Sequence, residues 1–75
     1  SNLSVLLVEP QPLIRSLVVS VGRQLDLACI EETASVEVAV QRLEGTRYDG
    51  LLLSLEDHGR AVALLERLRA GGLAS

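Results

Sequence analysis

Three short aliphatic runs alternate along the chain with three stretches in which apolar residues recur every three or four positions. The runs are Val5–Val8, Leu27–Ile30 and Gly50–Leu55. Continuous apolar runs of this length are typical of strands that are buried on both faces of a parallel sheet. We expect the third run to be the most buried strand.

The periodic stretches predict three amphipathic helices. The first starts near Pro12, a residue suited to the first helical turn. The second starts after Ser35, a good N-cap residue, and is expected to close at Gly45. Gly71 and Gly72 are expected to end the third. The apolar positions are Ile14, Leu17, Val18, Val21 and Leu25 in the first helix, Val36, Ala39, Val40 and Leu43 in the second, and Ala61, Val62, Leu64, Leu65 and Leu68 in the third.

Strands that alternate with amphipathic helices predict an α/β fold with a parallel sheet. The 75 residues suffice for one small domain, and no linker or low-complexity tract divides residues 1–75. A core of this size supplies only about 3–5 kcal/mol, and a domain this short usually needs a staple, a metal or a partner for its stability.

Composition removes several classes of function. The net charge is −3, with no lysine and one aromatic residue, which argues against nucleic-acid binding. No apolar run is long enough to span a membrane, and no signal peptide is visible. Cys29 has no second cysteine to pair with. We expect it to be a small buried hydrophobic residue, in a reducing, cytoplasmic compartment.

Three segments resemble a known family. VLLVEPQPLIR resembles the first strand and loop of bacterial response-regulator receiver domains, and RYDGLLLSLED resembles their third strand. ACIEETASVEVAVQRL is similar to the second strand and helix of these domains. The resemblance covers the whole chain and the first three of the family's five βα units. It implies a three-layer, flavodoxin-like fold, truncated to β-α-β-α-β-α with strand order 2-1-3.

The chain departs from the family at the phosphorylation site. Receivers accept a phosphoryl group on an aspartate at the end of the third strand, and that position is Ser54 here. The acidic pair that ends the first strand is reduced to Glu9 and Pro10. The family's threonine or serine and its lysine follow the fourth and fifth strands, which lie outside this chain. The resemblance therefore implies a degenerate receiver, or pseudo-receiver, that is not an enzyme and binds protein partners without phosphorylation.

Other interpretations of the polar residues remain open. Ser54 could accept a phosphoryl group from a kinase, or simply fill the former carboxylate position. Glu9, helped by Glu56 or Asp57, could hold Mg²⁺ weakly, or these could be solvated loop acids; no other cofactor is expected. Ser54, Asp57 and His58 are the residue types of a hydrolase triad, but the Gly-x-Ser-x-Gly elbow is missing. Asp57 and His58 alone offer too few ligands for zinc. We expect His58 to be a surface loop residue.

Strand order 2-1-3 would leave Gly50–Leu55 at an edge without a charge or proline to protect it. We therefore expect a homodimer, a segment-swapped assembly, or a longer receiver of which this chain is a part. The expected partner is a histidine kinase, an output domain or a second copy of the chain. The arginines Arg60, Arg67 and Arg69 are expected on the polar side of the last helix, for solubility or a partner contact. The alternative function is part of a working receiver with an altered magnesium and phosphoacceptor site.

Overall fold

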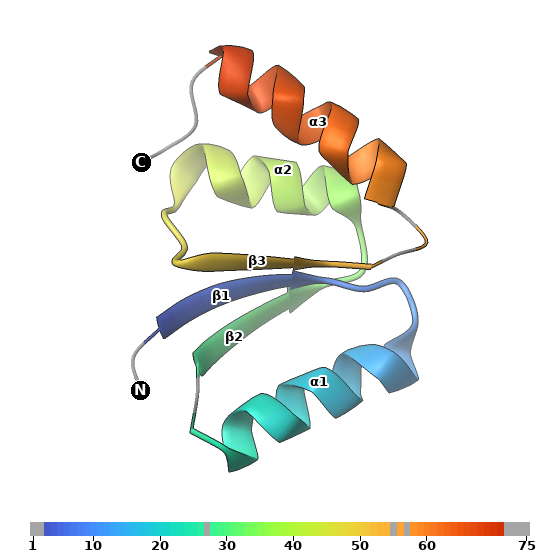
Figure 1. The fold of residues 1–75 in the computed structure, drawn as a ribbon, viewed down its shortest axis with the longest axis vertical. Helices are drawn as coiled ribbons and strands as arrows, with labels where there is room; N and C mark the ends of the chain where they lie inside the picture. The colour runs from blue at the N-terminus through green and yellow to red at the C-terminus, as the bar shows by residue number, and fades with distance from the viewer. Residues whose placement is uncertain (1–2, 27, 55, 57, 72–75) are drawn as a thin grey trace.

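The computed structural model describes residues 3–26, 28–54, 56 and 58–71. Strands and helices alternate in the order β1 (Leu3–Val8), α1 (Pro12–Gln24), β2 (Ala28–Thr33), α2 (Val36–Gly45), β3 (Gly50–Leu53) and α3 (His58–Gly71). All three strands are parallel, in the order β2-β1-β3. Helix α1 lies on one face of the sheet, and α2 and α3 lie on the other (Figure 1). The predicted α/β fold and strand order are confirmed.

The core is centred on β1, the middle strand. Leu6 is completely buried, and Leu7 and Val8 are almost so. Leu6 and Val8 pack with Val36 and Ala39 of α2, whereas Leu7 points to the opposite face because successive strand residues alternate. The run Val5–Val8 is therefore a strand buried on both faces, as predicted.

The prediction that the third run is the most buried strand is wrong. Strand β3 ends at Leu53, and Leu55 lies outside the described residues. Leu52 is 46% exposed. It is paired in register with Leu7 and so faces the α1 side of the sheet, but α1 packs mainly on β2 and leaves β3 uncovered there.

Helix α1 meets the sheet through a narrow part of its surface. Its buried residues are Val19 and Gly22. A Cβ atom on Gly22 would lie 2.5 Å from Cδ1 of Ile30, so the missing side chain lets the helix approach β2 closely. Four of the apolar positions that predicted this helix are exposed, namely Ile14, Leu17, Val21 and Leu25. The periodicity predicted the helix correctly, but most of its apolar stripe is not covered by the sheet.

The two ends of α2 differ in how well the sequence predicts them. Ser35 is the N-cap, as predicted, and its hydroxyl accepts a hydrogen bond from the Val38 N–H at 3.3 Å. Gly45 does not close the helix in a left-handed conformation. It is the last helical residue, and Thr46 follows in an extended conformation with φ −137°.

Strand β2 runs further than its apolar residues predicted. It continues through Glu31 and Glu32 to Thr33, while Leu27 lies outside the described residues. Cys29 is exposed, which corrects the expectation of a buried residue. Cys29 lies near the start of β2, and within the described part of the chain no strand pairs with the outer side of β2.

Helix α3 begins at His58, so the expectation that this residue lies in a loop is wrong. The side chains of His58, Ala61, Leu64, Leu65 and Leu68 lie outside the described part of the chain. Arg60, Arg67 and Arg69 are exposed, as expected. Arg60 forms an ion pair with Glu37 of α2, which links the two helices on this face.

A polar cluster joins β2, α2 and the segment before β3. The Tyr48 hydroxyl donates a hydrogen bond to Glu31, and the Arg42 guanidinium pairs with the same carboxylate. The hydrogen bond from Tyr48 lowers the pKa of Glu31, with a further contribution from Arg42, while partial burial opposes the shift. Burial raises the pKa of Tyr48, and the neighbouring Glu31 carboxylate raises it further.

This cluster predicts a pH dependence of stability. Because the pKa of Glu31 is lowered in the folded state, its stabilising contribution is present above the usual value of 4.5 and is lost as the pH falls through the folded value. We expect the urea midpoint to fall on acidification below pH 4.5 less steeply in Tyr48→Phe than in the natural chain. If the urea midpoints of the two proteins fell equally steeply between about pH 6 and about pH 3, the coupling of Glu31 to Tyr48 would be contradicted.

Candidate functional site at the carboxyl ends of β1 and β3

The carboxyl ends of the parallel strands form the candidate site. Glu9 follows β1 directly and Ser54 follows β3 directly, and each is only 8% exposed. Both line one cavity of about 300 Å³, together with Gln11, Ile14, Leu53 and Glu56. Crevices at this end of an open α/β sheet are where ligands usually bind. The structure therefore brings the predicted residues Glu9, Ser54 and Glu56 together.

Hydrogen bonds link the polar groups of the cavity to one another. The Gln11 backbone N–H donates to Oε2 of Glu9 at 3.0 Å, and its side-chain Nε2 donates to Oε1 of Glu56 at 3.0 Å. The Glu56 N–H donates to Oγ of Ser54 at 3.2 Å. Gln11 thus ties the loop after β1 to the loop after β3. Sequence analysis missed this role, although Gln11 lies in the loop that follows a predicted strand.

The sheet fixes the backbone of both site residues. The Ser54 N–H donates to the Val8 carbonyl at 2.9 Å, and the Glu9 N–H donates to the Thr33 carbonyl at 3.0 Å. Arg15 of α1 donates from Nη1 to the Glu9 carbonyl at 2.9 Å, and its Nε meets Oε1 of Glu32 at 3.2 Å. Arg15 is a second residue that sequence analysis missed, because only the packing of α1 on β2 places it beside Glu9.

The donor set offers little for a metal ion. Glu9 and Glu56 share the cavity, Pro10 contributes no side-chain oxygen, and Asp57 lies outside the described residues. Among the residues that the structure describes, no group of three or more His, Cys, Asp or Glu side chains could hold a metal ion. Magnesium usually takes one or two carboxylates and completes its octahedron with water or substrate oxygens. Glu9 and Glu56 are two such carboxylates, but both accept hydrogen bonds from Gln11, and these bonds compete with a metal ion.

The hydroxyl of Ser54 has a structural role in this arrangement. It accepts the Glu56 N–H two residues further along, which is a local turn that serine commonly makes. Of its potential triad partners, Asp57 and the side chain of His58 lie outside the described residues. Glu9 and Glu56 share the cavity, but among the described residues the Ser54 hydroxyl donates no hydrogen bond to either carboxylate, so neither is placed to activate it as a nucleophile.

No protein-family model, curated protein or solved structure matches this chain. Within the described residues, no helix combines the length and the apolar character needed to cross a membrane.

Proposed function

We propose that the chain is a non-catalytic, receiver-like module of bacterial two-component signalling, which acts in the cytoplasm by binding a protein partner. The observation that carries this proposal is the content of the crevice at the strand ends. Ser54 occupies the position after β3, and Glu9 and Glu56 are hydrogen-bonded to Gln11. A receiver-like site with this content lacks both the aspartate acceptor and one of the acidic pair.

The fold supports the same conclusion in its topology. The strand order β2-β1-β3, with α1 on one face and α2 and α3 on the other, is the arrangement of the first three βα units of a receiver. The sheet alone fits many functions, so the proposal depends on the site residues rather than on the fold.

An exposed apolar surface gives such a module somewhere to bind. Ile14, Leu17 and Val21 on α1 and Leu52 on β3 are all exposed. Apolar surface that is exposed on a small domain commonly marks a protein interface. The proposed partner is a histidine kinase, an output domain or a second copy, and a homodimer or a segment-swapped assembly is the proposed state.

The test is an amide NMR titration of the chain, first with Mg²⁺ and then with beryllofluoride, which mimics an aspartyl phosphate. We expect the resonances of Glu9, Ser54 and Glu56 to stay where they are, because both carboxylates accept hydrogen bonds from Gln11 and the acceptor position holds a serine instead of an aspartate. Incubation with a small phosphodonor is expected to leave the mass of the chain unchanged.

A joint shift of these three resonances, or stoichiometric uptake of a phosphoryl group, would contradict the proposal. It would favour a working receiver with an altered site, in which Glu56 or Asp57 replaces a missing carboxylate. Glu56→Gln and Asp57→Asn then identify the replacement, since only the variant that removes a ligand loses the Mg²⁺ response.

A further inference from the structure

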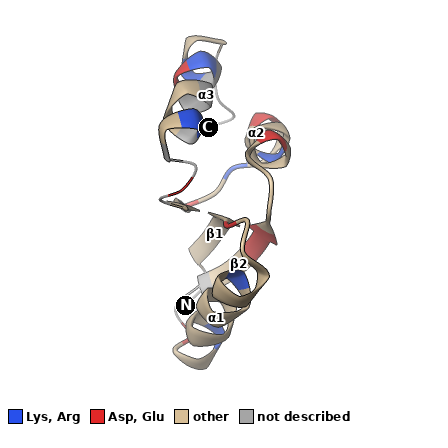
Figure 2. Cartoon of the chain, turned by 90° about the vertical axis from the view of Figure 1, so that its right-hand side faces the viewer, with Lys and Arg blue, Asp and Glu red and all other residues tan. Residues whose placement is uncertain are grey.

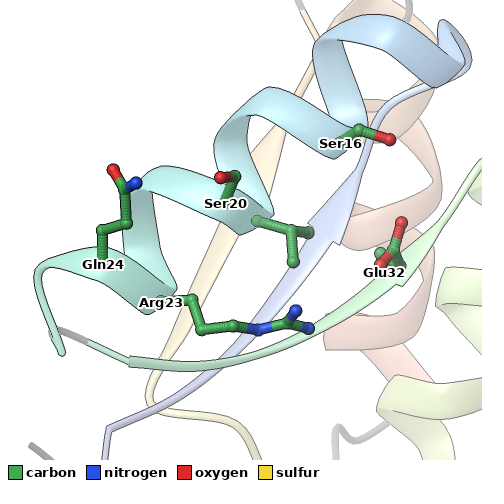
Figure 3. A pocket seen from close by; sticks show the side chains of 6 residues that line it. Ser16, Ser20, Arg23, Gln24 and Glu32 are labelled. Atoms are coloured by element: carbon green, nitrogen blue, oxygen red, sulfur yellow. The ribbon is translucent and has the colours of Figure 1, made fainter.

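The outer edge of β2 is the second open edge of the sheet, and a groove runs beside it. Ser16, Ser20, Arg23 and Gln24 of α1 border this groove, and Glu32 of β2 closes its far end, around a volume of about 450 Å³. Figure 3 shows the side chain of Arg23 reaching from α1 over β2, while Glu32 points up from the strand towards the helix. Figure 2 shows the acidic residues on β2 and the basic residues on α1.

The two faces of β2 carry different residues. Ile30 contacts Gly22 of α1, and Glu32 pairs with Arg15 of α1, so these two side chains face α1. Glu31 bonds to Arg42 and Tyr48 on the α2 side, so the odd-numbered side chains face α2.

The backbone of β2 also alternates. The Thr33 carbonyl accepts a hydrogen bond from Glu9, so Thr33 directs its backbone groups towards β1. In a parallel ladder this direction reverses at each residue. Ala28, Ile30 and Glu32 therefore turn their N–H and C=O groups outward, away from β1.

We propose that a second copy of this chain pairs with it through β2, antiparallel and about a two-fold axis at Ile30. The axis preserves the two faces of the sheet, so only residues of the same face can lie opposite each other. With Ile30 opposite Ile30, Ala28 lies opposite Glu32, and every outward residue of β2 finds an outward residue of the second copy. The result is a continuous six-stranded sheet. This inference rests on the homodimer named under the proposed function and specifies its interface, whereas the signalling role is tested separately by Mg²⁺ and the phosphodonor.

Charge complementarity selects this register. Arg23 lies next to Gly22, which touches Ile30, whereas Glu32 lies two residues beyond Ile30 along the strand. Helix α1 ends at Gln24, beside the start of β2, so Arg23 lies near the Ala28 end of the strand, and antiparallel pairing brings Glu32 of the second copy to that end. Arg23 has no ion pair among the described residues, and Glu32 is 45% exposed beside Arg15, so both can take a further partner. Each dimer contains this pair twice.

The neighbouring register and the other edge are less suitable. Moving the strands by two residues in one direction puts Glu31 directly opposite Glu31, and like charges in that position repel. Moving them by two residues in the other direction puts Ala28 opposite Ile30 and leaves Glu32 beyond the end of the partner's β2. At β3 the Ser54 N–H points to β1, which leaves only Leu51 and Leu53 turned outward. Pairing through β2 uses three outward residues from each chain and pairing through β3 uses two, so β2 forms more backbone hydrogen bonds.

Charge exchange provides the first test, by sedimentation equilibrium of the whole chain. Arg23→Glu alone and Glu32→Arg alone each place like charges together twice, and we expect each to weaken the dimer by about tenfold or more. An equimolar mixture of the two variants restores both pairs in a heterodimer, so we expect the mixture to dimerise as the natural chain does. Circular dichroism of each variant checks that it remains folded.

Disulfide trapping tests the register. In a Cys29→Ser background, Ile30→Cys places two thiols opposite each other with Cα atoms about 5.5 Å apart, within reach of a disulfide. The matched control, Glu32→Cys in the same background, places its two thiols about four residues apart along the paired strands, which is too far. We expect mild oxidation to link the first variant and not the second.

Several outcomes would overturn the proposal. A natural chain that stays monomeric at high concentration has no such dimer. A dimer that the charge variants leave intact and that Leu52→Lys breaks is formed at β3. This register is excluded if the mixture of the two charge variants dimerises no more strongly than either variant alone. It is also excluded if the chain dimerises but Ile30→Cys does not cross-link.

Discussion

Leu6→Ala is expected to unfold most of the chain at room temperature. Leu6 is completely buried in the central strand, where it packs with Val8, Val36 and Ala39. Truncating a buried leucine to alanine costs about 2–5 kcal/mol, because the cavity left behind is only partly filled. A core in a domain of this size supplies about 3–5 kcal/mol, so the substitution removes most or all of the available stability.

The matched control is Leu13→Ala in α1. Leu13 is 86% exposed, so the same chemical change there leaves no cavity, and we expect the free energy of unfolding to change by less than about 0.5 kcal/mol. Urea unfolding followed by circular dichroism measures both variants. A Leu6→Ala chain as stable as Leu13→Ala would mean that β1 is not the centre of the core.

The fold was predictable because local patterns and topology agree. Aliphatic runs and helical periodicity give the six elements, and a sheet with short crossovers permits few arrangements. Burial was less predictable, as Leu52 and Cys29 show. Both are apolar residues in strands, yet both are exposed because β3 is not covered by α1 and β2 has no outer neighbour. The apolar run of a strand does not show whether that strand lies at the centre or at the edge of the sheet.

The candidate site was predictable in its main residues and not in its hydrogen bonds. Glu9 and Ser54 could be placed together because they follow neighbouring parallel strands. Gln11 and Arg15 could not, because their contacts with Glu56 and Glu32 join residues that are distant in sequence. Which residues Gln11 and Arg15 contact depends on side-chain geometry, and neither composition nor spacing specifies that geometry.

Gly22→Leu is the second substitution expected to have a large effect. A Cβ at this position would lie 2.5 Å from Cδ1 of Ile30, and a leucine adds three further carbons to the same space. Glycine costs a helix about 1 kcal/mol relative to alanine, so any better helix former gains part of that energy. Overpacking costs about 1–3 kcal/mol or more, and a marginal domain leaves little room to relax. We expect a net loss of stability, because the helix must move off β2.

The matched control for this prediction is Gly45→Leu, the last residue of α2. No atom lies within 4 Å of a Cβ built there, so only the helix propensity changes and stability should stay the same or rise. Comparing the two urea midpoints separates the close approach of α1 to β2 from the general effect of replacing a helical glycine. If both variants are equally stable, α1 does not depend on Gly22 for its contact with the sheet. The groove beside β2 would then not be held in its present shape by that contact, and the placement of Arg23 over the strand edge would lose its structural basis.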